Sequence, residues 1–341
     1  MTRVLAGVLA LLMLAPAASQ AHVRSTAGYG EIRQDGATVR YELSLERQLL
    51  TAAAGERDAA IEGYLVDRVE ILLDGVACEG ALAGTAPERR DDRAYVRAHL
   101  EYECAGSPSG AYTVRYGVFT DADAVVDDHT SVTDYRLGEA SGTFVFDAGH
   151  RELDAGDAGL LSSARQFVAL GVEHILAGID HVLFLLVLLL GARNFRSVVE
   201  LATTFTVAHS ITLALAALGW VQVPGEIVEP LIALSIAYVA VENVLGGESR
   251  HRLAVVFGFG LLHGLGFAST LSFTDQMSWQ LLASLLSFNV GIELGQALIV
   301  AAAFPLLLAL RHLSFSAVAH AGAAAIAATF GLMWFFERLV A

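Results

Sequence analysis

One segment of this chain, residues 171–190, is apolar and long enough for a membrane-spanning helix, yet it carries Glu173, His174, Asp180 and His181. An ionisable side chain near the bilayer centre costs about 2.5–3.5 kcal/mol on insertion scales. These four side chains are therefore expected to face a protein interior. Imidazole together with carboxylate is a ligand set for first-row divalent metals, whereas hydrogen bonding between helices without a metal is the alternative.

The spacing of these residues predicts two polar stripes along one helix. At about 100° per residue, His174 and His181 lie seven positions apart on one stripe, and Glu173 and Asp180 lie on its neighbour. Gly178 lies between the two histidines, where its small size would let another helix approach closely.

Hydropathy predicts six membrane spans. Hydrophobic residues make up 55% of the 341 positions, which is above the average for soluble proteins. The predicted spans are roughly residues 164–190, 197–218, 227–246, 252–271, 280–310 and 314–337. The predicted fold is an all-α six-span membrane helix bundle within residues 160–341, preceded by an exported antiparallel β-sandwich-like domain.

The charges of the connecting loops predict the orientation of the spans. If the N-terminal domain is exported, the first span runs from outside to inside. The loops predicted inside carry Arg193, Arg196, Arg250, Arg252 and Arg311. The loops predicted outside, residues 219–226 and 272–279, contain no Arg, and Trp220 and Trp279 lie at the outer interface. This distribution satisfies the positive-inside rule.

The first 21 residues have the features of a secretory signal peptide. Arg3 precedes an apolar core from Val4 to Ala15, and small residues lead to a cleavage site after Ala21. Cleavage would leave His22 at the N-terminus, where an amine beside an imidazole can chelate copper or nickel. An N-terminal histidine without any metal is the simpler alternative.

Residues 22–155 are expected to form the exported domain. Alternating apolar and polar runs separated by turn residues predict strands of an antiparallel β-sandwich. These runs are residues 39–45, 69–73, 95–102, 112–118 and 142–146, and a short helix is expected within residues 47–64. Cys78 and Cys104 are the only cysteines, and their place in an exported domain predicts a disulfide.

The exported domain is strongly acidic. Residues 22–160 contain 26 Asp and Glu against 13 Arg. The loop from Asp121 to His129 is a candidate cation site, although such loops are commonly only solvated. The chain has no Lys and no basic patch, which argues against a nucleic-acid partner.

The other predicted spans also carry polar side chains at membrane depth. Glu200 follows Arg196 by four residues, which predicts an ion pair, and Glu229 stands where a helix would begin. His320 stands alone among small residues, where packing is the simpler role. The candidate ligands and supporting groups are His209, Glu242, His263, Asn289, Glu293 and Gln296.

The composition of this predicted interior indicates the kind of cargo. Imidazoles, carboxylates and amides without any Arg point to a cation. Three or four imidazoles favour a transition metal such as Ni²⁺, Co²⁺, Zn²⁺ or Cu²⁺ over alkali ions, and the lack of Met and Cys among the polar groups disfavours Cu(I).

A weak internal repeat is also present. Gly171-x-x-His174 in the first span matches Gly260-x-x-His263 in the fourth. Phe205-Thr-Val-Ala208 in the second span similarly matches Phe288-Asn-Val-Gly291 in the fifth. Halves of three spans each would be inverted relative to one another, a common design of secondary transporters.

The run His174-Ile-Leu-Ala-Gly-Ile-Asp-His181 resembles the His-x-x-x-Gly-x-Asp-His signature of the HupE/UreJ membrane proteins, a group of nickel and cobalt permeases. The resemblance extends through residues 205–213, 262–268 and 288–296, and it is strongest to the branch with an exported N-terminal domain. Ile175 and Phe184 stand where better-understood members have Pro and Met.

This resemblance implies metal uptake without direct use of ATP, and no nucleotide-binding motif is present. It makes His174, Asp180 and His181 the signature residues. It also implies the inner membrane of a bacterium as the location, with a periplasmic metal donor or a metalloenzyme maturation system as a partner.

The leading functional prediction is alternating exposure of a metal site at the bilayer midplane, with protons competing for the ligands. The first alternative is an intramembrane hydrolase whose ligands hold Zn²⁺ and an activated water. The second is a haem-binding electron carrier. The ligands predicted for the metal site are His174, Asp180, His181, His209, His263 and Glu293, supported by Glu173, Glu242, Asn289 and Gln296.

Overall fold

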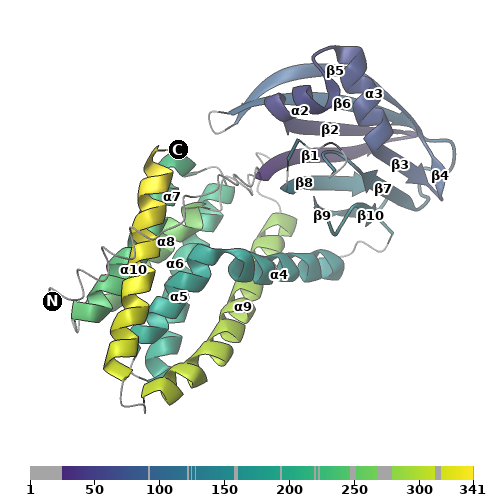
Figure 1. Ribbon diagram of the computed structural model, residues 1–341. Coiled ribbons are helices and arrows are strands. Elements are labelled where there is room, and N and C mark those ends of the chain that lie inside the picture. Colours follow the sequence, from purple (N-terminus) through teal and green to yellow (C-terminus); the bar gives the residue numbers. More distant parts are fainter. Residues whose placement is uncertain are drawn as a thin grey trace. The chain divides into compact units, whose positions relative to one another are not determined.

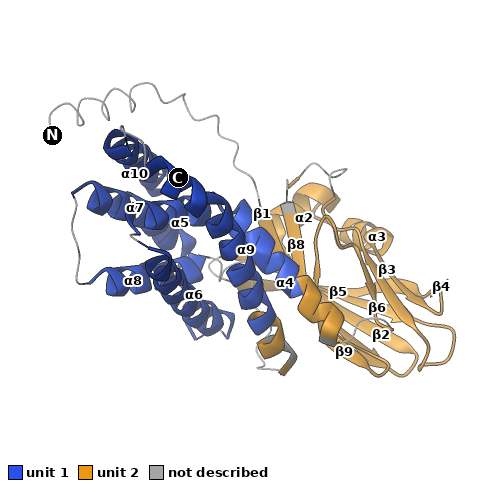
Figure 2. Cartoon of the chain, turned by 90° about the horizontal axis from the view of Figure 1, so that it is seen from below, with its two compact units in different colours: residues 1–20, 167–269, 286–341 blue, residues 21–166, 270–285 orange. Residues whose placement is uncertain are grey.

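The structure is a computed structural model in which two compact units are recognised (Figures 1 and 2). It describes residues 25–340 except 91–92, 121–122, 124, 127, 157–159, 193, 219, 222, 246–250, 267–278 and 312–315. The predicted signal peptide, His22 and most of the second outer loop lie outside the described residues. One unit comprises residues 21–166 and 270–285, and the other comprises residues 1–20, 167–269 and 286–341.

The N-terminal unit is built on two β-sheets. Its strands are β1 (Ser25–Asp35), β2 (Thr38–Glu46), β3 (Val69–Leu73), β4 (Val76–Ala77), β5 (Glu79–Arg90), β6 (Arg93–Glu103), β7 (Tyr112–Tyr116), β8 (Asp128–Leu137), β9 (Ala140–Phe146) and β10 (Glu152–Asp154). One sheet has the order β5-β6-β2-β1-β8-β9, and the other has the order β10-β7-β3-β4. β1 and β8 run parallel, so the expectation of purely antiparallel pairing is wrong there. A long connection separates these two strands in the chain, as parallel pairing requires.

The predicted strand segments lie in strands because their alternation matches the burial of the sheet. In β2, Val39, Tyr41, Leu43 and Leu45 are each 0% exposed. Residues two apart in a strand point to the same face, so these four side chains enter one apolar core. This confirms that the N-terminal unit is β-rich.

Two helices follow β2, where the sequence predicted a single short helix within residues 47–64. They are α2 (Arg47–Ala54) and α3 (Asp58–Arg68). Gly55 separates them with a positive φ of 94°, a conformation that glycine adopts without the strain of a Cβ atom.

A disulfide joins Cys78 and Cys104. Cys78 directly precedes β5, and Cys104 directly follows β6. Because Glu79 pairs with Glu103, the bond closes the end of the β5–β6 strand pair. The cysteines are 26 positions apart. Closing a loop of this size lowers the conformational entropy of the unfolded chain, which stabilises the folded domain by about 3 kcal/mol.

A histidine is buried in the core of this domain. His129 on β8 is 3% exposed, and its Nε2 lies 2.7 Å from the Tyr116 hydroxyl. Its ring also packs against the rings of Tyr116 and Phe119. Burial, with a smaller contribution from the charge of Arg151, lowers the pKa of His129 to about 3.

We expect the N-terminal unit to lose stability as the pH falls below about 6.5. The unfolded chain then binds a proton at His129 that the folded domain excludes, because the folded pKa is lower. The free energy of unfolding should fall by about 2 kcal/mol between pH 6.5 and 5. The change is measured by unfolding the full chain in urea at both pH values, with protease cleavage within this unit as the readout of its unfolding. H129Q should lose this pH dependence and the exposed-histidine control H150Q should keep it; equal slopes in all three proteins would contradict the expectation.

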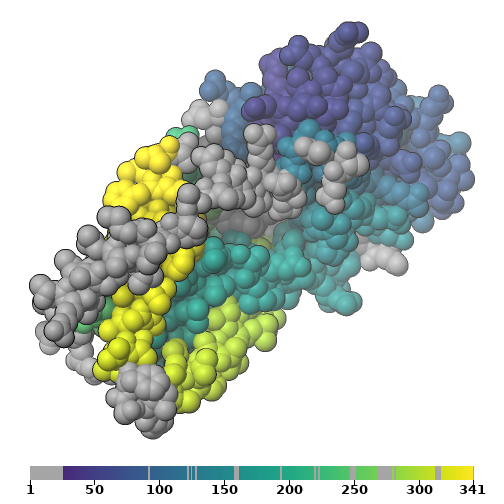
Figure 3. All heavy atoms as spheres, viewed as in Figure 1, coloured from purple at the N-terminus to yellow at the C-terminus, as the bar shows by residue number. Residues whose placement is uncertain are grey.

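The C-terminal unit is helical. The helices are α4 (Leu160–Ala177), α5 (Ile179–Gly191), α6 (Phe195–Ala217), α7 (Gly225–Leu245), α8 (Arg252–Gly266), α9 (Trp279–Arg311) and α10 (Ser316–Val340). The first turns of α4, up to residue 166, and of α9, up to residue 285, belong to the other unit. Among the described residues, α6, α7, α9 and α10 are apolar and long enough to cross a membrane, and the bent pair α4–α5 can count as a fifth span. α8 is apolar but shorter. α7 packs on α10 and α6 on α8, and α10, in yellow, lies on the visible face in Figure 3.

The first predicted span is not one straight helix. α4 and α5 meet at Gly178 with a bend of 70°. The Gly178 N–H donates to the His174 carbonyl, and the Gly178 carbonyl accepts from Val182 N–H, so one helix closes as the next begins. A Cβ at position 178 would lie 2.6 Å from Nδ1 of His181. The expected continuous stripe is therefore wrong, because glycine at this position leaves room for the His181 ring to fold back.

Two arginines form hydrogen bonds to the C-terminal end of α5. Arg252, at the start of α8, donates to the Gly191 carbonyl at the end of α5 (3.0 Å). Arg311, at the end of α9, donates to the Ala192 carbonyl. Cations stabilise the carbonyl end of a helix. Both arginines bind carbonyls at the end of α5 and so lie close together. The predicted topology likewise puts both on the same side of the membrane.

Candidate functional site

Four histidines from four helices lie together in the helical unit. The ring centres of His174 (α4) and His181 (α5) are 4.7 Å apart, and His181 lies 5.2 Å from His263 (α8). His209 (α6) lies 5.8 Å from His181 and 5.9 Å from His174. On a continuous helix, His174 and His181 would be separated by about 10 Å of helix rise. The bend at Gly178 therefore creates this group, which we call the histidine cluster.

The spacing of the histidine cluster is close to that of imidazoles sharing one metal ion. A metal–nitrogen bond of about 2.1 Å puts ring centres about 4.6 Å apart at a right angle and about 5.3 Å apart at a tetrahedral angle. Two of the four measured separations fall in this range, and both separations to His209 are longer. Within the described residues, no group of three or more His, Cys, Asp or Glu is already arranged to hold an ion. Binding would require ring rotations.

Three histidines of the cluster, His181, His209 and His263, have buried ring nitrogens without a hydrogen bond to the described residues. His209 is 0% exposed and His263 is 1% exposed. Nδ1 of His263 donates to the Phe259 carbonyl at 2.8 Å. Nε2 of His263 and both ring nitrogens of His181 and of His209 are buried and make no hydrogen bond to the described residues. Buried polar atoms in proteins are nearly always bonded, so these nitrogens are suited to an external ligand.

Phenylalanine rings enclose the cluster. Phe184 lies 4.9 Å and Phe205 lies 5.1 Å from the ring of His263. Phe288 lies 5.5 Å from the ring of His174. Apolar walls exclude water and strengthen any interaction between an ion and its ligands. Sequence reasoning missed this lining, because phenylalanine is unremarkable in a membrane span.

The two copies of the internal repeat make matching contacts. A Cβ at Gly171 would lie 2.1 Å from the Phe288 carbonyl oxygen, and a Cβ at Gly260 would lie 2.7 Å from the Phe205 carbonyl oxygen. In each copy, the histidine three residues after the glycine packs on the ring of that same phenylalanine. The Gly-x-x-His motif of the first half thus packs on the phenylalanine motif of the second half. The Gly-x-x-His motif of the second half packs on the phenylalanine motif of the first half.

Polar side chains join α6 to α9 on both sides of His209. The Thr206 hydroxyl donates to Oε1 of Gln296 at 3.0 Å, and the Ser210 hydroxyl donates to Oδ1 of Asn289 at 2.8 Å. Asn289 and Gln296 thus form hydrogen bonds to the helix that carries His209, and their role as supporting groups stays a prediction.

The predicted carboxylate ligands are placed differently. Glu173 on α4 and Glu293 on α9 are exposed, so neither is buried with the histidines. Oε2 of Glu242 is buried without a hydrogen bond to the described residues. The neighbouring Asn243 donates to the Val187 carbonyl and accepts from Arg252. It thus lies close to the end of α5, to which Arg252 and Arg311 donate hydrogen bonds. A role of these three glutamates as ligands or supporting groups stays a prediction.

Asp180 has an arginine partner. Its Oδ2 lies 2.9 Å from Nη2 of Arg338 near the end of α10. The expectation that no arginine lies among the interior polar groups is therefore wrong. Sequence reasoning missed Arg338 because it falls just beyond the last predicted span, although an arginine at the predicted outer end departs from the positive-inside pattern.

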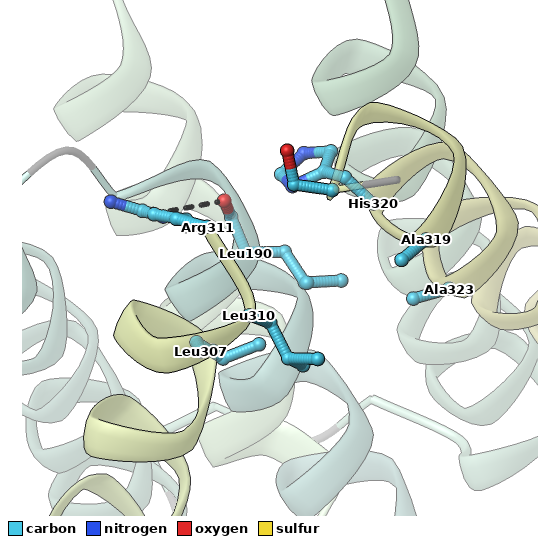
Figure 4. Close-up of a pocket in the computed structure, with 8 residues that line it drawn as sticks. Leu190, Leu307, Leu310, Arg311, Ala319, His320 and Ala323 are labelled. Atoms are coloured by element: carbon cyan, nitrogen blue, oxygen red, sulfur yellow. Dashed lines mark hydrogen bonds between the residues drawn. The ribbon is translucent and has the colours of Figure 1, made fainter. Parts of the chain in front are cut away.

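Two other candidates lie outside the cluster. His320 lines a separate cavity of about 70 Å³ (Figure 4). Arg311 and Leu190 also line it, at the end of the helical unit where the loop arginines lie. Glu200 forms the predicted ion pair with Arg196, at 2.8 Å.

An arginine on α3 pairs with the acidic loop of the N-terminal unit. Both carboxylate oxygens of Asp123 accept hydrogen bonds of 2.8 Å from Arg68. One of them also accepts from the Tyr64 hydroxyl. Asp121 and Asp127 lie outside the described residues. Arg68 thus neutralises Asp123, which disfavours this carboxylate as a metal ligand.

Comparison with known protein families identifies a relative of the helical unit. A family model described as HupE / UreJ protein matches residues 152–338. The chain belongs to the HupE/UreJ family. The match runs from β10 to Arg338, so it contains all four histidines of the cluster in this HupE/UreJ protein, and it confirms the resemblance drawn from the motifs. No curated protein matches the chain.

Proposed function

We propose that this HupE/UreJ protein is a secondary transporter for a divalent transition-metal cation, with nickel or cobalt as cargo. The observation that carries the proposal is the convergence of four imidazoles. Three of them, those of His181, His209 and His263, have buried ring nitrogens that make no hydrogen bond to the described residues. Imidazole suits nickel, cobalt and zinc better than hard alkali ions. The rings would rotate toward the ion on binding, and protons would compete with it for the same nitrogens.

The transport step would be alternating exposure of the histidine cluster. A broken helix at the site and a repeat whose copies make matching contacts are both typical of secondary transporters built from inverted halves. Gly171 and Gly260 provide the two matching contacts. Rocking of these helix pairs against each other would open the cluster first to one side of the membrane and then to the other.

We further propose six spans in a bacterial inner membrane, with the β-rich domain on the periplasmic side. α4–α5 and α8 would supply the first and fourth spans. In this orientation, Arg252 and Arg311 face the cytoplasm, as the positive-inside rule favours. A periplasmic metal donor or a metalloenzyme maturation system would then meet the chain on one side of the membrane.

Uptake into proteoliposomes tests this function. Purified full-length protein is reconstituted, and the entry of radioactive Ni²⁺ and Co²⁺ is compared with that of Mg²⁺ and with protein-free liposomes. Protein-dependent entry of Ni²⁺ or Co²⁺ but not Mg²⁺ is expected, because imidazole disfavours the hard ion. If no metal crosses, transport is wrong. A metal that co-purifies without crossing would favour the metal-dependent hydrolase instead.

A further inference from the structure

The end of α10 is tied to two other helices by one arginine. Nη2 of Arg338 contacts Asp180 on α5 at 2.9 Å, and its Nη1 donates to the Glu229 carbonyl on α7 at 3.2 Å. The guanidinium also lies 5.9 Å from the ring centre of Trp334. The side chains of Arg338 and Asp180 are 24% and 19% exposed, so the ion pair is shielded from much of the solvent.

Arg338 occupies only one oxygen of the Asp180 carboxylate. Oδ1 of Asp180 is buried and makes no hydrogen bond to the described residues. Asp180 directly precedes His181, the ring that contacts the three other cluster histidines. The carboxylate that directly precedes His181 is thus neutralised by a cation belonging to the protein itself.

We propose that Arg338 is a tethered cation that holds Asp180 while the histidine cluster is empty of cargo, and that a divalent cation must displace it to bind. This inference rests on the proposed function. A divalent ion bound by imidazoles attracts the neighbouring carboxylate more strongly than a guanidinium does, because its charge is twice as large. Release of Arg338 would free the end of α10 from α5 and α7, which links cargo binding to a movement of that helix.

A double-mutant cycle separates this role from that of a simple structural tie. The affinities for Ni²⁺ and Co²⁺ are measured by titration calorimetry on purified full-length wild type, R338Q, D180N and the double variant. R338Q should bind about tenfold more tightly than wild type, because the competing cation is gone, and the same change in the D180N background should alter affinity by less than about twofold. R338K, which keeps the charge, should stay close to wild type.

The outcomes separate this inference from the proposed function. Wild-type binding with unchanged or weaker affinity in R338Q would overturn the inference and leave transport standing. A wild-type chain that binds neither metal would overturn both. If R338Q does not fold, hydrogen exchange on wild type decides: Ni²⁺ should speed exchange in residues 330–340 while it slows exchange in residues 174–182. Unchanged or slower exchange at the end of α10 would overturn the inference.

Discussion

Replacement of His181 by alanine is expected to reduce Ni²⁺ or Co²⁺ uptake by about 100-fold or more, since loss of even an indirect support of a metal ligand commonly costs about 10–100-fold. His181 is the ring that contacts all three of its cluster partners, at 4.7, 5.8 and 5.2 Å. Its loss would leave His174 and His263 without the imidazole between them. The measurement is the initial rate of uptake into proteoliposomes containing equal amounts of protein.

His320→Ala is the matched control for this loss. His320 is also a histidine of the helical unit, but it lines the separate cavity beside Arg311 (Figure 4). H320A should transport at a rate close to that of wild type. Equal rates for H181A and wild type would show that the histidine cluster is not the path of the metal, whereas equal losses in both variants would point to a general sensitivity of the fold.

Replacement of Gly264 by leucine is expected to displace α8 from α6. A Cβ at this position would lie 2.2 Å from Oγ1 of Thr212 and 2.3 Å from the His209 carbonyl oxygen. Because the backbone of α6 cannot yield as a flexible side chain does, overpacking should cost about 2–3 kcal/mol or more. The same displacement would separate His263 from the rest of the cluster. Thermal unfolding and the size-exclusion profile in detergent measure the effect.

Gly258 offers a control on the same helix. A Cβ at position 258 would meet nothing within 4 Å, so G258L adds the same side chain without the close Cβ contacts that G264L creates. G258L should unfold within about 1 °C of wild type, whereas G264L should unfold several degrees lower or aggregate. Similar stability of the two variants would mean that the close approach of α8 to α6 does not hold this region of the protein together.

Close packing between helices recurs at the glycines of the repeat. Small residues allow helices to approach in a membrane, where apolar surface alone does not drive them together. Gly171 and Gly260 use this to place a histidine beside Phe288 and Phe205, respectively. The same type of close contact therefore occurs on both sides of the histidine cluster.

Local patterns in the sequence were enough to predict much of this protein. Hydropathy predicts the helices, because a helix that spans a membrane needs about 20 consecutive residues that are mostly apolar. Alternation located strands such as β2, because side chains point to opposite faces of a strand with a period of two. The motif around His174 and His181 indicated the HupE/UreJ family before any geometry was known. Each of these signals is contained in a single segment of the chain.

Only the tertiary structure decided how the segments meet. Four separate helices supply the histidine cluster, and its shape depends on a bend at Gly178 that hydropathy does not register. The pairing of Asp180 with Arg338 joins residues 158 positions apart. The exposure of Glu293 likewise depends on how α9 is turned. Helical periodicity tells which residues share a face, but the partner of that face is set by close packing between helices distant in the chain.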